Sequence, residues 1–153
     1  MMMKKIFPLL ETLKLKGCRK NLDEIVNEAE QSQMSYITFL YNILDAEIKD
    51  RAERRLKRNM TGAHFPVIKR LEEFKHGRIK GITKTQISSL LDFRWIDNHN
   101  NLLFFGPPGL GKTHLSIALG IKAVEAGYTV CFERITNLIK IFKMAEIQKV
   151  QWI

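Results

Sequence analysis

The chain has 153 residues, enough for one ordinary domain with an appendage or for a small domain with a helical extension. Hydrophobic residues make up 45% of it and charged residues 27%, which is normal for a globular protein and argues against wholesale disorder. The formal net charge of +9 favours polyanionic partners such as nucleic acid, although many basic proteins bind none.

Targeting and redox signals are weak in this sequence. The two cysteines, Cys18 and Cys131, form no CxxC pair, so neither a disulfide scaffold nor a zinc site is expected. The apolar start of the chain is broken by Pro8, and no stretch reaches the ~18 apolar residues that a bilayer span needs. We therefore expect a soluble, cytoplasmic protein that does not enter a membrane.

Residues 1–65 predict a helical N-terminal region. Between residues 5 and 60, apolar side chains recur at helical spacing in three stretches. Gln31-Ser32-Gln33 predicts a break before the third helix, and Ser35 suits the N-cap of that helix. Pro66 disfavours the α conformation in the residue before it, so we place the domain boundary there.

A strongly basic run lies near the end of this region. Residues 49–58 hold six basic and two acidic side chains. One interpretation is a solvated helix end, where cations suit the negative pole of the helix dipole. The other interpretation is a contact with the phosphate backbone of nucleic acid. The candidate DNA-binding residues are Arg51, Arg54, Arg55, Lys57 and Arg58.

The remaining chain divides at residue 100. Residues 66–100 predict a linker with one helix at 84–93, and residues 101–153 predict a partial second domain. The apolar pattern of this last part alternates β-α-β-α, which is the signature of an α/β fold. The predicted elements are a strand at 101–105, a helix at 113–126, a strand at 128–133 and a helix at 135–147.

A glycine-rich loop joins the first predicted strand to the helix after it. Its sequence, Gly106-Pro107-Pro108-Gly109-Leu110-Gly111-Lys112-Thr113, matches the whole Walker A pattern G-x-x-x-x-G-K-[ST]. The glycines let backbone N–H groups approach phosphate oxygens, and the N-terminus of the helix adds a partial positive charge. Lys112 would reach the β- and γ-phosphates, and the hydroxyl of Thr113 would hold Mg²⁺. The sequence therefore predicts ATP and Mg²⁺ as cofactors.

Two side chains near the loop are less specific. His114 follows the motif directly and is counted with the ATP-binding residues 106–113, although an ordinary helix position explains it better. Glu133 ends the second predicted strand, where catalytic carboxylates are often found, but an isolated surface glutamate is the favoured interpretation. No catalytic residue and no metal ligand other than Thr113 is predicted.

Several segments outside the Walker pattern narrow the class of P-loop protein. They are the rest of 106–120, residues 126–130, the stripe at 22–29, Ser35–Leu40, Arg54–Lys57, and Phe65-Pro66 followed by Leu71–Phe74. In these segments the sequence resembles the IstB-like ATP-binding proteins, transposition helper ATPases related to the DnaC helicase loaders within the AAA+ class. The likeness covers about residues 5–142. It implies an α/β P-loop NTPase fold of AAA+ type preceded by an all-α N-terminal region. It also implies a DNA-associated protein that recruits or activates a transposase, with a homo-oligomer as one option.

The family pattern is not complete in this chain. The resemblance implies an acidic Walker B motif, a polar sensor and an arginine finger, which ATP hydrolysis requires. The 40 residues after Thr113 contain no apolar run that ends in Asp-Glu. The chain therefore reads as an N-terminal piece of a longer protein, with an incomplete sheet and impaired hydrolysis. Three alternatives are open for this part. The two predicted strands pair with each other, or another chain completes the sheet, or the α/β part is only marginally folded.

Three functions remain open at this point. The first is an ATP-binding, DNA-associated transposition helper. The second is a non-catalytic fragment that binds DNA or protein and carries a vestigial phosphate loop. The third is a P-loop small-molecule kinase, which is disfavoured because only Arg134 follows the loop and no lid-like insertion is present.

Overall fold

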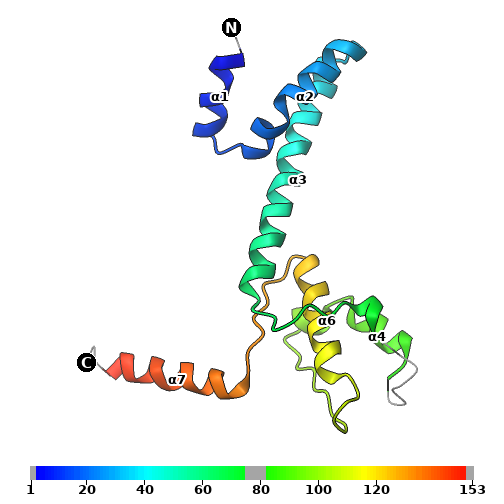
Figure 1. Cartoon of the computed structure of the whole chain (residues 1–153), viewed down its shortest axis with the longest axis vertical. Coiled ribbons are helices and arrows are strands. Elements are labelled where there is room, and N and C mark those ends of the chain that lie inside the picture. Colours follow the sequence, from blue (N-terminus) through cyan, green and yellow to red (C-terminus); the bar gives the residue numbers. More distant parts are fainter. Residues whose placement is uncertain (1–2, 75–81, 151–153) are drawn as a thin grey trace. The chain divides into compact units, whose positions relative to one another are not determined.

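The computed structural model describes residues 3–74 and 82–150 of the chain (Figure 1). All regular elements in these ranges are helical. They are α1 (Met3–Thr12), α2 (Lys16–Ser32), α3 (Tyr36–Gly62), the 3-10 helix η1 (Leu71–Glu73), α4 (Lys84–Leu90), α5 (Arg94–Asp97), α6 (Lys112–Glu125) and α7 (Ile135–Val150). None of the helices in the described ranges is both long enough and apolar enough to cross a membrane.

The chain divides into two compact units, Met1–Lys57 and Arg58–Ile153. Local sequence sets the helix ends in the first unit. Helix α2 ends where Gln33 adopts the left-handed conformation, with φ 49°, and its N–H donates to the carbonyl oxygen of Ala29. Helix α3 begins after Ser35, whose Oγ accepts the N–H of Thr38 at 3.2 Å. The predicted cap at Ser35 is therefore confirmed. The break lies two residues later than predicted, at 33–35 instead of 31–33, because Gln31 and Ser32 still belong to α2.

Helices α2 and α3 approach each other closely at Gly17. A Cβ at this position would meet three atoms of α3 at 2.7 Å each, a distance at which something must shift. These atoms are Ala46 O, Asp50 Cβ and Glu47 Cα. Because two of the three belong to the main chain, α3 cannot yield by turning a side chain aside. The crossing of the two helices therefore requires glycine at residue 17.

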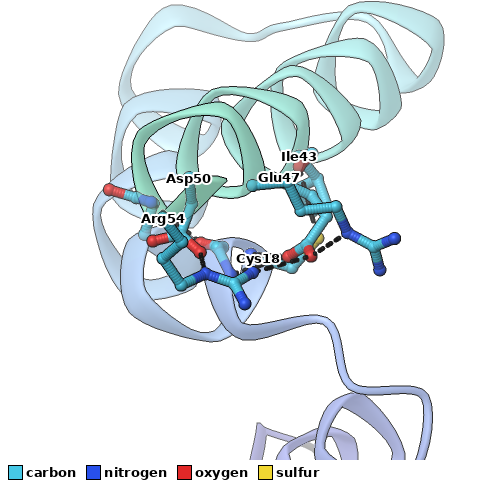
Figure 2. A network of polar contacts seen from close by, with 8 residues as sticks. Cys18, Ile43, Glu47, Asp50 and Arg54 are labelled. Carbon is cyan, nitrogen blue, oxygen red and sulfur yellow. Dashed lines mark hydrogen bonds and ion pairs between the residues drawn. The ribbon is translucent and has the colours of Figure 1, made fainter. Parts of the chain in front are cut away.

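A buried carboxylate completes this junction (Figure 2). Glu47 is 5% exposed, and its Oε2 accepts the N–H groups of Gly17 at 2.6 Å and Cys18 at 3.1 Å. The first N–H groups of any helix lack partners within it, and the N-cap residue of α2 offers no side-chain bond. Glu47 therefore caps α2 from the neighbouring helix. Its other oxygen, Oε1, accepts Nε of Arg51 at 2.7 Å.

These hydrogen bonds fix the charge of Glu47. Burial by itself would raise the pKa of the carboxyl, but the hydrogen bonds from Arg51, Cys18 and Gly17 outweigh burial and lower the pKa below its ordinary value. The side chain is therefore an ionised carboxylate at neutral pH. Hydrogen bonds to an ionised acceptor are stronger than those between neutral groups, so the cap of α2 is charge-assisted.

Helix α6 lies at the centre of the second unit. Leu115 and Leu119 form a buried cluster with Phe74 and Ile87, which precede α6 in the chain. A Cβ at Gly120 would come within 2.9 Å of the Phe65 ring. A helix that is apolar around most of its circumference is a core helix. The buried residues of α6 are Leu115, Ile117, Ala118, Leu119, Ile121, Ala123 and Val124.

The helices predicted after residue 80 are present with small shifts. Helix α4 starts with a reciprocal capping box, in which Thr83 Oγ1 accepts the N–H of Gln86 at 3.1 Å and Gln86 Oε1 accepts the N–H of Thr83 at 2.8 Å. It ends at Leu90 instead of Phe93, since Phe93 takes a left-handed φ of 57° and starts α5. Helices α6 and α7 each lie within three residues of their predicted bounds.

The predicted α/β fold is wrong, since the described residues contain no strand and no sheet. The first predicted strand, 101–105, is an irregular segment. Leu102 and Phe104 pack on the core around α6, whereas Leu103 is 71% exposed and Phe105 is 87% exposed. A strand in a parallel sheet is covered on both faces and paired along its edges. Here only one face is covered, and no described segment pairs with the edges.

The second predicted strand, 128–133, is also irregular. The N–H of Phe132 donates to the carbonyl oxygen of Ala63 at 2.8 Å, and the Phe132 ring lies 6.1 Å from the ring of Phe65. The segment is therefore held by the residues that follow α3. This hydrogen bond goes to the turn after α3 and not to residues 101–105. It therefore does not join the two predicted strands in a sheet.

We expect Gly17→Ala to destabilise the first unit. The added methyl group collides with main-chain atoms of α3, and overpacking of this kind costs about 1–3 kcal/mol. The free energy of unfolding in urea, followed by circular dichroism, measures the loss. Gly62→Ala is the matched control, because a Cβ there meets nothing within 4 Å. Equal stability of the two variants would contradict the close crossing.

We expect Glu47→Gln to lose about 1–3 kcal/mol of unfolding free energy at neutral pH, because the buried cap loses its charge. The folded pKa of Glu47 lies below the unfolded value of about 4.3, so its stabilisation is present above that value. It disappears as the pH falls through the folded pKa. The stability gap between wild type and variant should therefore close below about pH 4. A gap that is independent of pH, measured in urea at several pH values, would rule out this role.

Candidate functional site

The glycine-rich loop leads directly into α6. Gly106, Gly109 and Gly111 have positive φ angles of 148°, 82° and 85°. Gly111 is the N-cap of α6, and the first helical bond runs from the N–H of Leu115 to the carbonyl oxygen of Gly111 at 2.9 Å. A side chain at 111 would strain the left-handed backbone. The N–H groups of the first turn lack helical partners, so the positive pole of α6 faces the loop.

Lys112 folds back onto the loop. Its Nζ donates to the carbonyl oxygens of Gly106 at 2.8 Å and of Pro107 at 2.7 Å. The ammonium group therefore lies at the entrance of the loop, where it bridges two neutral acceptors. Phosphate oxygens form stronger, charge-assisted bonds with an ammonium group than carbonyl oxygens do. The amine is thus positioned to exchange these partners for an anion bound in the loop.

The next two residues face different surroundings. Thr113 lies in the first turn of α6 and is exposed. His114 contacts the linker, where its Nε2 lies 2.9 Å from the carbonyl oxygen of Arg70 and its ring packs edge-on against Phe74 at 5.4 Å. The linker is fastened to α6 at a second point, where Lys122 Nζ lies 3.1 Å from Glu72 Oε1. His114 therefore joins α6 to the linker, and its role toward a nucleotide stays a prediction.

An apolar cavity of about 380 Å³ lies beside the loop. Ligand pockets in proteins measure roughly 300–1,000 Å³, so this cavity is large enough for a ring system such as a purine. Lys112 is the charged side chain on its wall, and the other walls are mostly apolar. The lining includes Phe74, Leu102, Phe104, Leu110, Lys112 and Leu115.

Glu133 serves the start of α7. Its Oε1 accepts the N–H of Arg134 and Nδ2 of Asn137, both at 2.8 Å. The hydrogen bonds from Asn137 and Arg134 lower the pKa of the Glu133 carboxyl. The geometry accounts for this residue as an exposed carboxylate that holds Arg134 and Asn137 at the start of α7. Within the described ranges, His, Cys, Asp and Glu side chains form no group of three that could hold a metal ion.

The basic run lies on α3, where its side chains are exposed. Two of its arginines are held by carboxylates one turn earlier (Figure 2). Arg54 Nε lies 2.6 Å from Asp50 Oδ2, and Arg51 Nε lies 2.7 Å from Glu47 Oε1. The five candidate DNA-binding residues therefore share one helix but differ in their partners.

Glu47 is the residue that the sequence interpretation missed. It stands four residues after Ile43 and one before Ile48, within the apolar stretch of α3. A carboxylate inside such a stretch signals a buried partner, because an unpaired buried charge is costly. The partner itself, the N-terminus of α2, lies 30 residues earlier and leaves no local signal.

The proteins that this chain resembles are described as ATP-binding proteins, in agreement with the phosphate-binding loop. The family model described as IstB-like ATP binding protein matches residues 8–151. A protein of insertion sequence IS21 from Pseudomonas aeruginosa, whose name describes ATP binding, is 34% identical over 86% of this chain and 49% of its own length. A similarly named IS21-like protein of Bacteroides fragilis (strain YCH46) is 32% identical over 95% of this chain and 73% of its own length.

A third relative, an insertion-sequence protein of Sinorhizobium fredii that is also named for ATP binding, is 32% identical over 90% of this chain and 46% of its own length. The chain thus spans about half the length of several curated relatives that it matches. The family model covers most of the chain, including both the helical leader and the phosphate loop. The chain belongs to the family of IstB-like ATP-binding proteins.

Proposed function

We propose that this protein is an ATP-binding, DNA-associated helper of transposition that works in the cytoplasm. The observation that carries the proposal is the complete phosphate loop, whose left-handed glycines lead into the first turn of a buried helix. The relatives' names support it, since they describe ATP-binding proteins of insertion sequences.

The residues of the loop fit the phosphates of ATP. The N–H groups of residues 109–113 and the positive pole of α6 would bind phosphate oxygens. Lys112 would exchange the carbonyl oxygens of Gly106 and Pro107 for the β- and γ-phosphates. Thr113 would hold Mg²⁺ through its hydroxyl, and the ion would neutralise part of the phosphate charge. These residues support binding, and the proposal does not include hydrolysis.

The proposed partners follow from the family and from charge. The chain carries a net charge of +9, and a basic run on an exposed helix is the usual electrostatic footprint of a DNA-binding protein. Contacts to phosphates fix position and carry no base sequence, so the run predicts affinity without specificity. A transposase is the proposed protein partner, and a homo-oligomer is the proposed assembly.

We expect Lys112→Ala to weaken the binding of Mg²⁺-ATP about tenfold or more, because charge-assisted hydrogen bonds to two phosphates are lost. Isothermal titration calorimetry measures the affinity. Lys140→Ala removes the same charge from an exposed position on α7 and should bind ATP like the wild type. If wild type and Lys112→Ala bind equally or not at all, the loop is vestigial and the interaction-fragment alternative is favoured.

We expect charge reversal of Arg54, Arg55 and Arg58 to glutamate to abolish binding of duplex DNA at low salt. The change replaces attraction to the phosphates with repulsion. An electrophoretic mobility shift with a labelled duplex reports the loss. The matched control reverses three exposed lysines outside the run, Lys84, Lys140 and Lys143. Unchanged DNA binding in the triple arginine variant would refute the proposed role of the run.

A further inference from the structure

The basic run contains two kinds of arginine that stand next to each other in the sequence. Arg54 is held by Asp50 at 2.6 Å, and its Nη2 lies 3.6 Å from Oε1 of Glu47 (Figure 2). Arg55 is exposed and has no acidic partner among residues 3–74 and 82–150. The two side chains carry the same charge and lie on the same helix, but among the described residues only Arg54 has carboxylate partners.

Releasing Arg51 or Arg54 from its carboxylates has a cost that releasing Arg55 does not have. Glu47 is 5% exposed, and its carboxylate depends on Arg51 as its partner of opposite charge. A buried charge that loses its partner destabilises the fold strongly. Asp50 is also largely shielded, with a side-chain exposure of 16%. A DNA phosphate would therefore have to compete with internal carboxylates for both arginines.

The charges of this cluster also cancel. Glu47 and Asp50 together carry two negative charges, and Arg51 and Arg54 carry two positive charges within 2.6–3.6 Å of them. Seen from a phosphate several ångströms away, the four groups are close to neutral. Arg55 follows Arg51 by four residues, so it stands on the same face of α3 one turn further along. Among Arg51, Arg54 and Arg55, it is Arg55 whose guanidinium has no carboxylate partner in the part of the chain that the structure describes.

We propose that Arg55 is the arginine of the first unit that contacts DNA phosphates, and that Arg51 and Arg54 are positioning residues that hold Glu47 and Asp50. This inference rests on the proposed DNA association. It assigns different roles to arginines of the basic run at 49–58, all of which the sequence predicts as DNA contacts. Glu47 then links the cap of α2 to the orientation of the basic face of α3.

The test compares Arg54→Gln with Arg55→Gln, two identical substitutions at adjacent positions. Fluorescence anisotropy with a labelled duplex of mixed sequence gives the affinity at several KCl concentrations. Each phosphate contact contributes about 0.9 to the slope of log affinity against log salt concentration. Arg55→Gln should lower the magnitude of this slope by about 0.9 and leave the thermal midpoint unchanged. Arg54→Gln should leave the slope unchanged and lower the thermal midpoint.

An equal loss of slope in both variants, or a larger loss in Arg54→Gln, would overturn the assignment. Asp50→Asn provides a second test should Arg54→Gln fail to fold, because it frees Arg54 without removing a cation. Its slope should be at least as steep as that of the wild type, and a shallower slope would overturn the assignment. Absence of any wild-type DNA binding at low salt would instead overturn the proposed DNA association, and this inference with it.

Discussion

The phosphate loop depends on the packing of α6. This helix is buried around most of its circumference, by the cluster of Phe74 and Ile87 and by the ring of Phe65. Because the helix is fixed, its first turn and the left-handed Gly111 before it are fixed as well. On its C-terminal side the loop is therefore anchored to the packed helix α6. The segment before the loop, residues 101–105, is covered on one face only. An anion that binds here meets a preorganised helix terminus.

The first unit depends on a different kind of contact. The carboxylate of Glu47 satisfies the N–H groups of Gly17 and Cys18 that α2 cannot satisfy itself, and it does so at a crossing that admits only glycine. The same carboxylate binds Arg51. One buried charge thus joins a helix cap, a helix crossing and the basic face of α3. A substitution that removes the charge of Glu47 therefore also weakens the cap of α2.

The sequence predicts the local features well and the long-range ones poorly. The loop at 106–113, the cap at Ser35 and the bounds of α6 follow from residue types within a few positions of each other. The apolar run at 101–105 predicts a strand, but a strand exists only where another segment pairs with it, and the run does not encode that partner. The role of Glu47 is hidden for the same reason, because its partners lie 29 and 30 residues away.

The central claim is that the N–H groups of the loop and of the first turn of α6 bind the phosphates of ATP. Amide chemical shifts of ¹⁵N-labelled protein, recorded during titration with Mg²⁺-ATP, test this claim most directly. The account predicts large, saturable shifts at Gly109, Gly111, Lys112 and Thr113, and small ones in the first unit. Shifts that are absent from the loop, or that are scattered over the basic surface as for a non-specific anion, would contradict it.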